Sequence, residues 1–306
     1  MPAETAVRVD PGQAVCPHKS GVRIGGVSLA LNGASANEVR LSRELESFRD
    51  DHESPDIEVN VKWVESLQRW PGDAVFDSGS LWTLFRDGRE LVFDFTSPAF
   101  GDCPYKRIRT NVDFHQAQLM LNYDAMASHR QVFPLEYPAD ELLITNHLSW
   151  GLGIEVHGCG LVDTETGGHL FLGHSGAGKS TSTLLWKKLR DPEILSDDRL
   201  ILRLRDGELW MYGTPWHGEA AFASPGRGKI NKICILQHGK CNRFTELPRA
   251  RAVGELFARC FPPFHSAAGL ANTIDFLDRV TNLVPVYEFQ FVPDRSAIDA
   301  VLGFDD

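Results

Sequence analysis

Gly173-His-Ser-Gly-Ala-Gly-Lys179-Ser180 is the stretch that decides the fold of the second half of this sequence. It fits the pattern G-x-x-x-x-G-K-[ST], in which glycines aim successive backbone N–H groups inward and let a phosphate approach without a Cβ clash. The apolar run His169–Leu172 precedes it, and Thr181–Lys188 has the pattern of a helix, whose free N–H groups add to an anion site. The stretch therefore predicts a phosphate-binding loop between a strand and a helix.

Each position of this loop has an expected role. Lys179 is expected to reach the β- and γ-phosphates of a nucleoside triphosphate, and the Ser180 hydroxyl is expected to ligate Mg²⁺. His174 fills a variable position and is given no catalytic role. ATP and Mg²⁺ are the expected cofactors, and the expected nucleotide-binding residues are Gly173, Ser175, Gly176, Ala177, Gly178, Lys179, Ser180 and Thr181. The alternative is a glycine-rich turn that only joins a strand to a helix.

Two adjacent carboxylates, Asp197 and Asp198, follow about twenty positions after Lys179, with apolar residues on both sides. One acid at a strand end near a phosphate loop is the usual second partner of Mg²⁺. A pair allows one carboxylate to hold the metal while the other takes the proton from an attacking hydroxyl. The alternative is a helix cap or a turn.

With this loop and this acid pair, the sequence resembles the C-terminal catalytic domain of the HPr kinase/phosphorylase family, which shares a phosphate-binding core with ATP-dependent phosphoenolpyruvate carboxykinase. A His-Gly pair before the loop and an Asp-Asp pair after it separate this group from ordinary mononucleotide-binding NTPases. The resemblance covers about residues 140–240, in four segments: Val156-His157-Gly158-Cys-Gly-Leu161-Val162, Gly168-His-Leu-Phe-Leu-Gly173, Ser175-Gly-Ala-Gly-Lys-Ser180 and Leu195-Ser-Asp-Asp198.

The resemblance implies roles for individual residues. The family counterpart of Asp197 acts as the base toward a serine hydroxyl, and the counterparts of Asp198 and Ser180 serve the metal. The counterpart of His157 lies near the acidic pair and supports proton handling. The expected catalytic residues are therefore Asp197, His157 and Lys179. Taken alone, His157 would be an ordinary core or surface histidine.

The sequence departs from the family pattern in two places. HPr kinases carry an acidic-basic pair followed by a Gly-x-Gly-Ile stretch, which serves phosphorolysis and the protein substrate. Here Tyr212-Gly-Thr-Pro-Trp-His217-Gly-Glu219 and Ser224-Pro-Gly-Arg227-Gly-Lys229 stand in its place. The N-terminal half also differs from the usual HPr kinase N-domain. Both departures favour the wider set of related kinases, including those that act on peptides made in biosynthetic clusters, over HPr as substrate.

The irregular segment 213–229 is a candidate substrate loop, because loops beside a phosphate site commonly grip substrates. Glu219 is a candidate ligand for a second metal. Arg227 or Lys229 is expected to neutralise charge on the transferring phosphoryl group. The alternative is an ordinary surface loop with an ion pair, and Trp216 is assigned to packing.

The expected fold class is α/β: a P-loop kinase domain of the HPr kinase/PEP carboxykinase type, preceded by a β-rich N-terminal domain. The chain is predicted to have two domains. Residues 1–135 form a β-rich accessory or substrate domain with a loose arm at 1–20, and residues 136–306 form the catalytic domain. Strands are expected at 59–63, 81–86, 90–95, 111–119, 154–162, 169–172, 200–204, 209–212 and 230–236, and helices at about 142–148, 181–188, 248–260, 271–283 and 294–302. Asp87-Gly88 predicts a hairpin turn, and Gly167-Gly168 a turn before the phosphate-loop strand.

The composition of the chain argues against several classes of binding partner. The chain has 306 residues and a formal charge of −10, which argues against nucleic acid or an anionic membrane as the main partner. Six cysteines without a CxxC pair favour reduced thiols in a cytoplasm, and the N-terminus has no signal-peptide pattern. The remaining histidines and cysteines form no zinc-ligand spacing.

Three functions stay open. The leading hypothesis is Mg-ATP-dependent phosphorylation of a serine-type hydroxyl on a peptide or protein. The second is a kinase of a small hydroxylated metabolite or a carboxykinase-like reaction. The third is a nucleotide-binding sensor without turnover. The family resemblance also allows for a homo-oligomer, since HPr-type enzymes are commonly hexameric.

Overall fold

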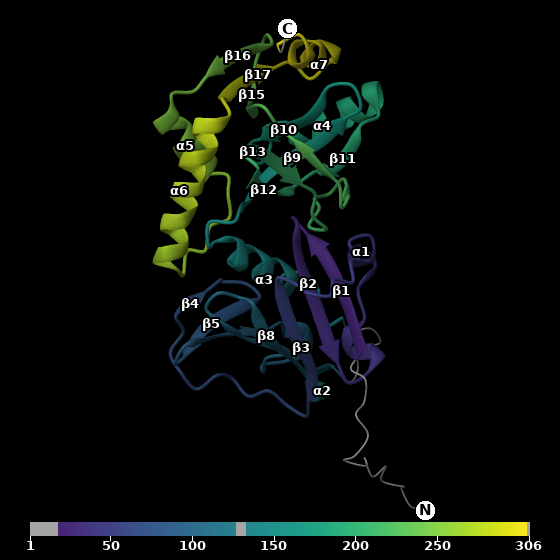
Figure 1. Cartoon of the computed structure of the whole chain (residues 1–306), viewed down its shortest axis with the longest axis vertical. Helices are drawn as coiled ribbons and strands as arrows, with labels where there is room; N and C mark the ends of the chain where they lie inside the picture. Colours follow the sequence, from purple (N-terminus) through teal and green to yellow (C-terminus); the bar gives the residue numbers. More distant parts are fainter. Residues whose placement is uncertain (1–17, 127–132, 305–306) are drawn as a thin grey trace, which may run out of the picture.

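The computed structural model describes residues 18–126 and 133–304, which form a mixed α/β structure with two large mixed sheets (Figure 1). The N-terminal part of the chain forms the first sheet and the C-terminal part the second, and helix α3 (Ala139–Leu148) lies between them. Most of the expected loose arm lies outside the described residues, but residues 18–20 are the start of a strand. The domain division near residue 135 stays a prediction.

The first sheet has eight strands in the order β1-β2-β3-β8-β7-β6-β5-β4. Strand β3 pairs in parallel with β2 and β8, and the other neighbours are antiparallel. The strands are β1 (His18–Ile24), β2 (Val27–Gly33), β3 (Ile57–Val64), β4 (Phe76–Asp77), β5 (Trp82–Asp87), β6 (Glu90–Phe95), β7 (Lys106–Asn111) and β8 (Gln116–Asn122). Four short helices accompany them: η1 (Ala36–Val39), α1 (Arg43–Glu46), η2 (Pro98–Phe100) and α2 (Tyr123–Met126).

The second sheet has nine strands in the order β14-β13-β12-β9-β10-β15-β17-β16, with β11 also paired to β9. The pairs β10–β15 and β15–β17 are parallel, and the others are antiparallel. The strands are β9 (Ile154–Asp163), β10 (Gly167–Leu172), β11 (Glu193–Ser196), β12 (Arg199–Arg205), β13 (Glu208–Tyr212), β14 (Arg227–Lys229), β15 (Ile233–His238), β16 (Arg243–Glu246) and β17 (Val286–Phe291).

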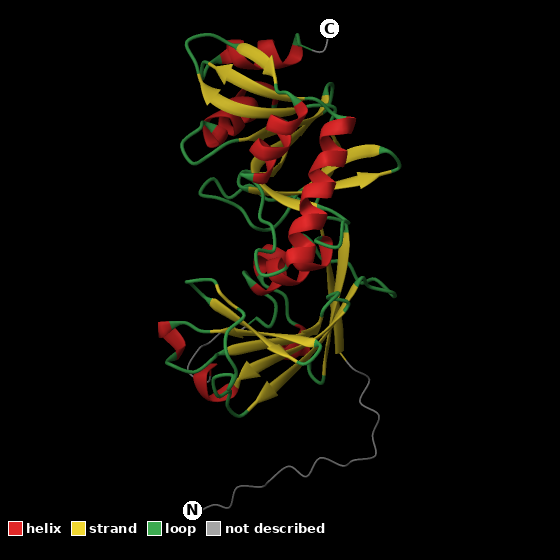
Figure 2. Ribbon diagram, turned by 90° about the vertical axis from the view of Figure 1, so that its left-hand side faces the viewer, coloured by secondary structure: helices red, strands yellow, loops and turns green. Residues whose placement is uncertain are grey.

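Helices cover both faces of the second sheet because its strands are apolar on both sides. Leu170 and Leu172 of β10 pack in a core with residues of α5 and α6, whereas Phe171 packs in another core with residues of α4 and α7. Figure 2 shows red helices flanking the strands of this part. Within the described ranges, no helix is long and apolar enough to span a membrane. The helices are α4 (Lys179–Arg190), α5 (Arg249–Phe257), α6 (Ala267–Leu283) and α7 (Arg295–Leu302).

The turn between β1 and β2 joins the two parts of the chain. The Arg203 guanidinium donates to the carbonyl oxygens of Gly25 and Gly26 at 3.2 and 2.8 Å. A side chain at Gly25 would run into Ile201, so the close contact depends on glycine there. The core of the first sheet accordingly continues into Ile201, Tyr212 and Trp216 of the C-terminal part.

Several sequence-based assignments need correction. Residues 111–119 are not one strand, because a turn that leaves Phe114 at a φ of 59° separates β7 from β8. The turn expected at Gly167-Gly168 falls at 164–166, where the Asp163 carboxylate accepts from the backbone N–H groups of Glu165 and Thr166. Helix α4 begins at Lys179, two residues earlier than expected. The hairpin across Asp87-Gly88 is confirmed.

Gly158 on β9 offers a test of how tightly this sheet is packed. A Cβ there would lie 2.4 Å from Leu172 Cδ2 and 2.9 Å from the Phe171 carbonyl oxygen. We expect Gly158→Ala to lower the free energy of unfolding by about 1–3 kcal/mol in urea titrations, because the neighbouring backbone has to move. Gly254→Ala in α5, where nothing lies within 4 Å, is the control and should be neutral or slightly stabilising. Equal losses in both variants would contradict this account.

Candidate active site

Three segments converge on His157 and Gly158 of β9. On one side, the Gly158 N–H donates to the Asp198 carbonyl oxygen at 2.9 Å. On the other, Leu172 at the end of β10 pairs with Gly158, and the His157 N–H donates to the Arg259 carbonyl oxygen at 2.7 Å. The acid pair, the start of the glycine-rich loop and the segment after α5 therefore meet at one point of the sheet.

The glycine-rich loop leaves β10 and turns directly into α4. Gly176 and Gly178 have φ values of 78° and 100°, in the region that favours glycine. No atom lies within 4 Å of a Cβ built on Gly176, so that part of the loop is uncovered. Ser180 and Thr181 are exposed on the first turn of α4, whose N-terminal N–H groups lie at the loop. The loop is thus open beside Gly176, whereas the Phe291 ring packs against Gly178, and the open part together with the first turn of α4 suits an anion.

Lys179 is buried beneath this loop. Its Nζ donates to the carbonyl oxygens of Gly173 and His174 at 2.8 and 3.1 Å. Burial lowers the pKa of Lys179; the carboxylate of Asp198 opposes that shift, and the guanidinium of Arg259 adds to it. The ammonium is therefore held within electrostatic reach of both the acid pair and Arg259.

The two aspartates differ in what they contact. Asp198 Oδ1 lies 3.1 Å from His157 Nε2, and both side chains are about 30% exposed. Asp197 is buried, and its two carboxylate oxygens accept the backbone N–H groups of Gly218 and Ala220, both at 3.0 Å. A Cβ on Gly218 would lie 3.0 Å from Asp197 Oδ2, so the loop approaches closely there. Asp197 holds the 213–226 loop, whereas Asp198 and His157 form an accessible pair.

Arg199 ties the acid pair to α3. Its guanidinium contacts Asp198, Glu141 and the buried Glu155, the last at 3.3 Å. It also lies over the ring of Phe261, with 4.5 Å from Cζ to the centroid. Burial raises the pKa of Glu155 well above its usual value, and the negative charge of Asp198 contributes to the rise. Arg199 is thereby fixed by three carboxyl groups.

Arg259 is a site residue that the sequence patterns did not single out. It is 3% exposed, donates to His174 Nε2 at 2.9 Å and pairs with Glu255 at 2.6 Å. It thus joins the glycine-rich loop to the segment that pairs with β9. No local motif marks it, because its contacts are to residues far away in the sequence.

Three predicted residues are not brought to this point. Glu219 is exposed in the 213–226 loop, next to the residues that bind Asp197. Arg227 and Lys229 lie on the edge strand β14, where Arg227 stacks on Trp210 and Lys229 pairs with Glu208. Their contacts are those of an exposed sheet edge, and their assignment to metal or phosphate stays a prediction.

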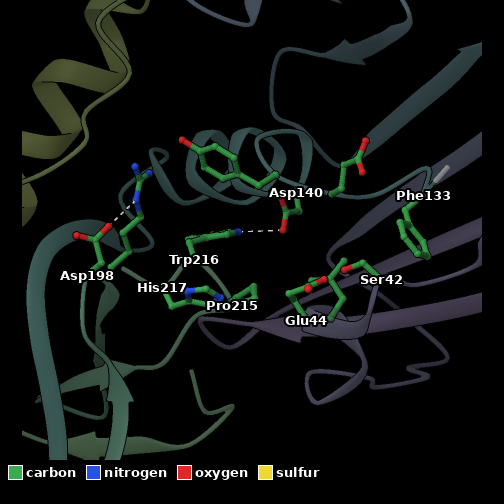
Figure 3. Close-up of a pocket in the computed structure, with 12 residues that line it drawn as sticks. Ser42, Glu44, Phe133, Asp140, Asp198, Pro215, Trp216 and His217 are labelled. Atoms are coloured by element: carbon green, nitrogen blue, oxygen red, sulfur yellow. Dashed lines mark hydrogen bonds and ion pairs between the residues drawn. The ribbon is translucent and has the colours of Figure 1, made fainter. Parts of the chain in front are cut away.

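A cavity of about 580 Å³ opens beside Asp198 (Figure 3). Its lining comes from α1, the start of α3, and the Pro215–His217 segment of the 213–226 loop. Trp216 Nε1 donates to Asp140 Oδ2 at 2.9 Å, which anchors this loop to α3. One cavity therefore contacts Asp198, the loop that binds Asp197, and the N-terminal part of the chain.

Comparisons with known proteins add little to this geometry. No family model matches the sequence, and no curated protein matches it. Among solved structures, the Hpr(Ser) kinase/phosphatase from Coxiella burnetii aligns over 49% of this chain and 94% of its own, at 11% sequence identity and a TM-score of 0.29. A TM-score of this size is too low to support an argument about fold or function.

The contacts of Asp197 generate a prediction about the 213–226 loop. We expect Asp197→Asn to speed hydrogen exchange at the backbone N–H groups of Gly218 and Ala220 by about 10- to 100-fold. In the variant, the asparagine NH₂ group replaces one carboxylate oxygen, and the oxygen that remains carries no charge. Asp198→Asn is the control and should leave both amides unchanged, since Asp198 accepts from neither. Equal protection in all three proteins would show that Asp197 does not hold the loop.

Proposed function

We propose that this protein is a Mg-ATP-dependent phosphotransferase that phosphorylates a hydroxyl group. The observation that carries the proposal is the convergence at His157–Gly158 of an uncovered glycine-rich loop, a buried lysine and an accessible His–Asp pair. The donor phosphates would lie over the loop and the first turn of α4. The acceptor would lie in the cavity that Asp198 lines.

The residues present fit a triphosphate that arrives with its metal. Among residues 18–126 and 133–304, no group of three or more His, Cys, Asp or Glu side chains is suited to hold a metal ion. Mg²⁺ in kinases is usually held by one or two protein groups together with the phosphates, so the Ser180 hydroxyl suits a nucleotide-borne ion. Lys179 would exchange its carbonyl partners for phosphate oxygens. Arg259 would add positive charge at the loop.

The accessible pair supports the proton transfer. MgATP supplies the phosphoryl group and neutralises much of its charge. Asp198, oriented by His157, takes the proton of the acceptor hydroxyl as that oxygen bonds to the γ-phosphorus and ADP leaves. This assignment differs from the family-based expectation, in which Asp197 is the base and Asp198 serves the metal. We favour Asp198 because it lines the cavity, while both oxygens of Asp197 already accept N–H groups.

The acceptor belongs to one of two classes. The family resemblance supports a serine-type hydroxyl on a peptide or protein. The cavity supports the second class, a small hydroxylated metabolite, because its volume of about 580 Å³ falls in the range of small-molecule sites. A sensor that binds nucleotide without turnover is the remaining alternative.

Nucleotide binding should depend on Lys179. We expect Lys179→Ala to weaken binding of a fluorescent ATP analogue by at least about tenfold, because charge-assisted bonds to phosphate are lost. Lys188→Ala, on the same helix but exposed, should bind as the unchanged protein does. Thermal unfolding of each variant separates lost binding from lost folding. Equal affinity in folded Lys179→Ala would contradict a phosphate-binding loop.

Phosphate transfer should depend on Asp198. With γ-labelled ATP and a panel of serine-containing peptides and small hydroxylated compounds, we expect Asp198→Asn to slow transfer by about 10²–10⁴-fold, the range for loss of a general base. If Asp197→Asn slows transfer as much while its loop amides stay protected, Asp197 is the base instead. If ATP loses its γ-phosphate equally slowly with the wild type and with Asp198→Asn for every acceptor, the kinase proposal fails and the sensor remains.

A further inference from the structure

The cavity beside Asp198 is the place where an acceptor has to bind if the proposed phosphotransfer is correct. We propose that its occupant is a small hydroxyl-bearing cation, a compound with an amine or guanidinium group whose hydroxyl lies against Asp198. This inference rests on the proposed function and names the class of its acceptor. It follows from the charges, the partners and the rings that line the cavity.

The lining carries an excess of negative charge. Four carboxyl groups line the cavity, with Arg199 as the one Lys or Arg side chain among the described residues. Hydrogen bonds from its backbone and from Ser42 lower the pKa of Glu44, which keeps that exposed carboxylate ionised. The four are Glu44, Glu136, Asp140 and Asp198.

The nearby cations are already engaged. Arg199 contacts three carboxyl groups, and two of them, Glu141 and Glu155, lie outside the cavity lining. Lys106 is fully buried and pairs with Glu136 at 3.0 Å, so it neutralises one carboxylate from behind. Glu44 and Asp140 have no such ion pair among the described residues, although His217 and Arg43 act on Glu44, and Lys106 acts on Asp140, at longer range. A ligand that brings a positive charge therefore meets acceptors that the protein neutralises only in part.

Asp140 carries an unused acceptor. It is 2% exposed, its Oδ2 accepts from Trp216 Nε1, and its Oδ1 has no hydrogen-bond partner among the residues that the structure describes. Burial raises the pKa of this carboxyl to about 6. This oxygen is itself shielded from solvent, and leaving such an atom without a partner is costly, so a donor that reached it as the cavity filled would gain more than at an exposed carboxylate.

Aromatic rings also line the cavity. They are Phe133, Tyr137 and Trp216, and Tyr137 is 52% exposed. Arg40 already lies over Phe133 and Arg199 over Tyr137, each with 5.4 Å from Cζ to the ring centroid, so Trp216 is the ring of the three with no such contact among the described residues. Aromatic faces attract ammonium and guanidinium groups. Figure 3 shows Trp216 and Phe133 together with Glu44 and Asp140 around the cavity. Rings with carboxylates between them suit a compound that has both a cationic and an apolar or hydroxylated part.

The charge pattern argues against two other acceptors. An anionic acceptor, such as one that is already phosphorylated, would be repelled by Glu44 and Asp198. A neutral polyol would satisfy Asp140 Oδ1 with a hydroxyl but would leave the charge excess uncompensated. In the transfer itself, the cation's hydroxyl oxygen bonds to the γ-phosphorus, the bond to the bridging oxygen of ADP breaks, and the proton passes to Asp198.

Matched compounds test the inference. Glucosamine, glucose and glucuronate share one ring but carry positive, neutral and negative groups, as serinol, glycerol and glycerate do on a smaller scale. Binding to the full chain with MgADP is measured by calorimetry or ligand-observed NMR, and transfer by consumption of labelled ATP. We expect the cationic member of a series to bind at least about tenfold more tightly than the neutral one, and the anionic member not to bind.

Two cavity variants and a control locate the effect. Glu44→Gln and Asp140→Asn should each lower the cation-to-neutral affinity ratio severalfold, whereas Asp73→Asn, an exposed site outside the lining, should not. Glu44 is exposed, so its variant stays informative if Asp140→Asn fails to fold. The inference is overturned if neutral or anionic members bind as well as cations, if no member binds, or if both variants keep the wild-type ratio.

The same measurements separate the inference from the function beneath it. If cations bind in the cavity but no ATP is consumed, the assignment of the cavity to a cation holds and the proposed kinase activity is contradicted. If ATP is consumed only with neutral, anionic or peptide acceptors, the kinase activity holds and the proposed cationic acceptor is contradicted.

Discussion

The missing side chain at Gly158 is the constraint on which the rest of the site depends. Because no Cβ stands there, β10 reaches β9 closely enough for Leu172 to pair with Gly158, and the glycine-rich loop starts at that level of the sheet. The Gly158 N–H meanwhile fixes the Asp198 carbonyl oxygen, which sets the position of the acid pair. The single strand β9 thus holds the glycine-rich loop and the acid pair at a fixed separation.

The two aspartates show how one acidic pair serves two tasks. Asp197 uses both oxygens to close the 213–226 loop, and Trp216 ties the same loop to Asp140 of α3. Asp198, the next residue in the bend between β11 and β12, instead contacts His157 and lines the cavity. The loop, the cavity wall and the acid pair therefore form one connected unit.

Local patterns explain which parts of this arrangement could be predicted. The Asp87-Gly88 turn, the apolar runs of β9 and β10 and the helix after the glycine-rich loop each depend on residues close together in the sequence, and these predictions were confirmed in type. The turn at Phe114 was missed because no glycine marks its positive φ. Arg259 and the cavity were missed because they arise from contacts between distant segments, such as the bond from Arg259 to His174. Periodicity and spacing carry no information about such contacts.

The distribution of charge around Asp198 would allow the proposed site to keep its two substrates apart. On the loop side lie Lys179, Arg259 and the N-terminal N–H groups of α4, all of which favour an anion. On the cavity side lie Glu44 and Asp140, which repel one. Under the proposed function, a triphosphate would thus favour the loop and a cation the cavity. Asp198 belongs to both surroundings, because it lines the cavity and also acts electrostatically on Lys179.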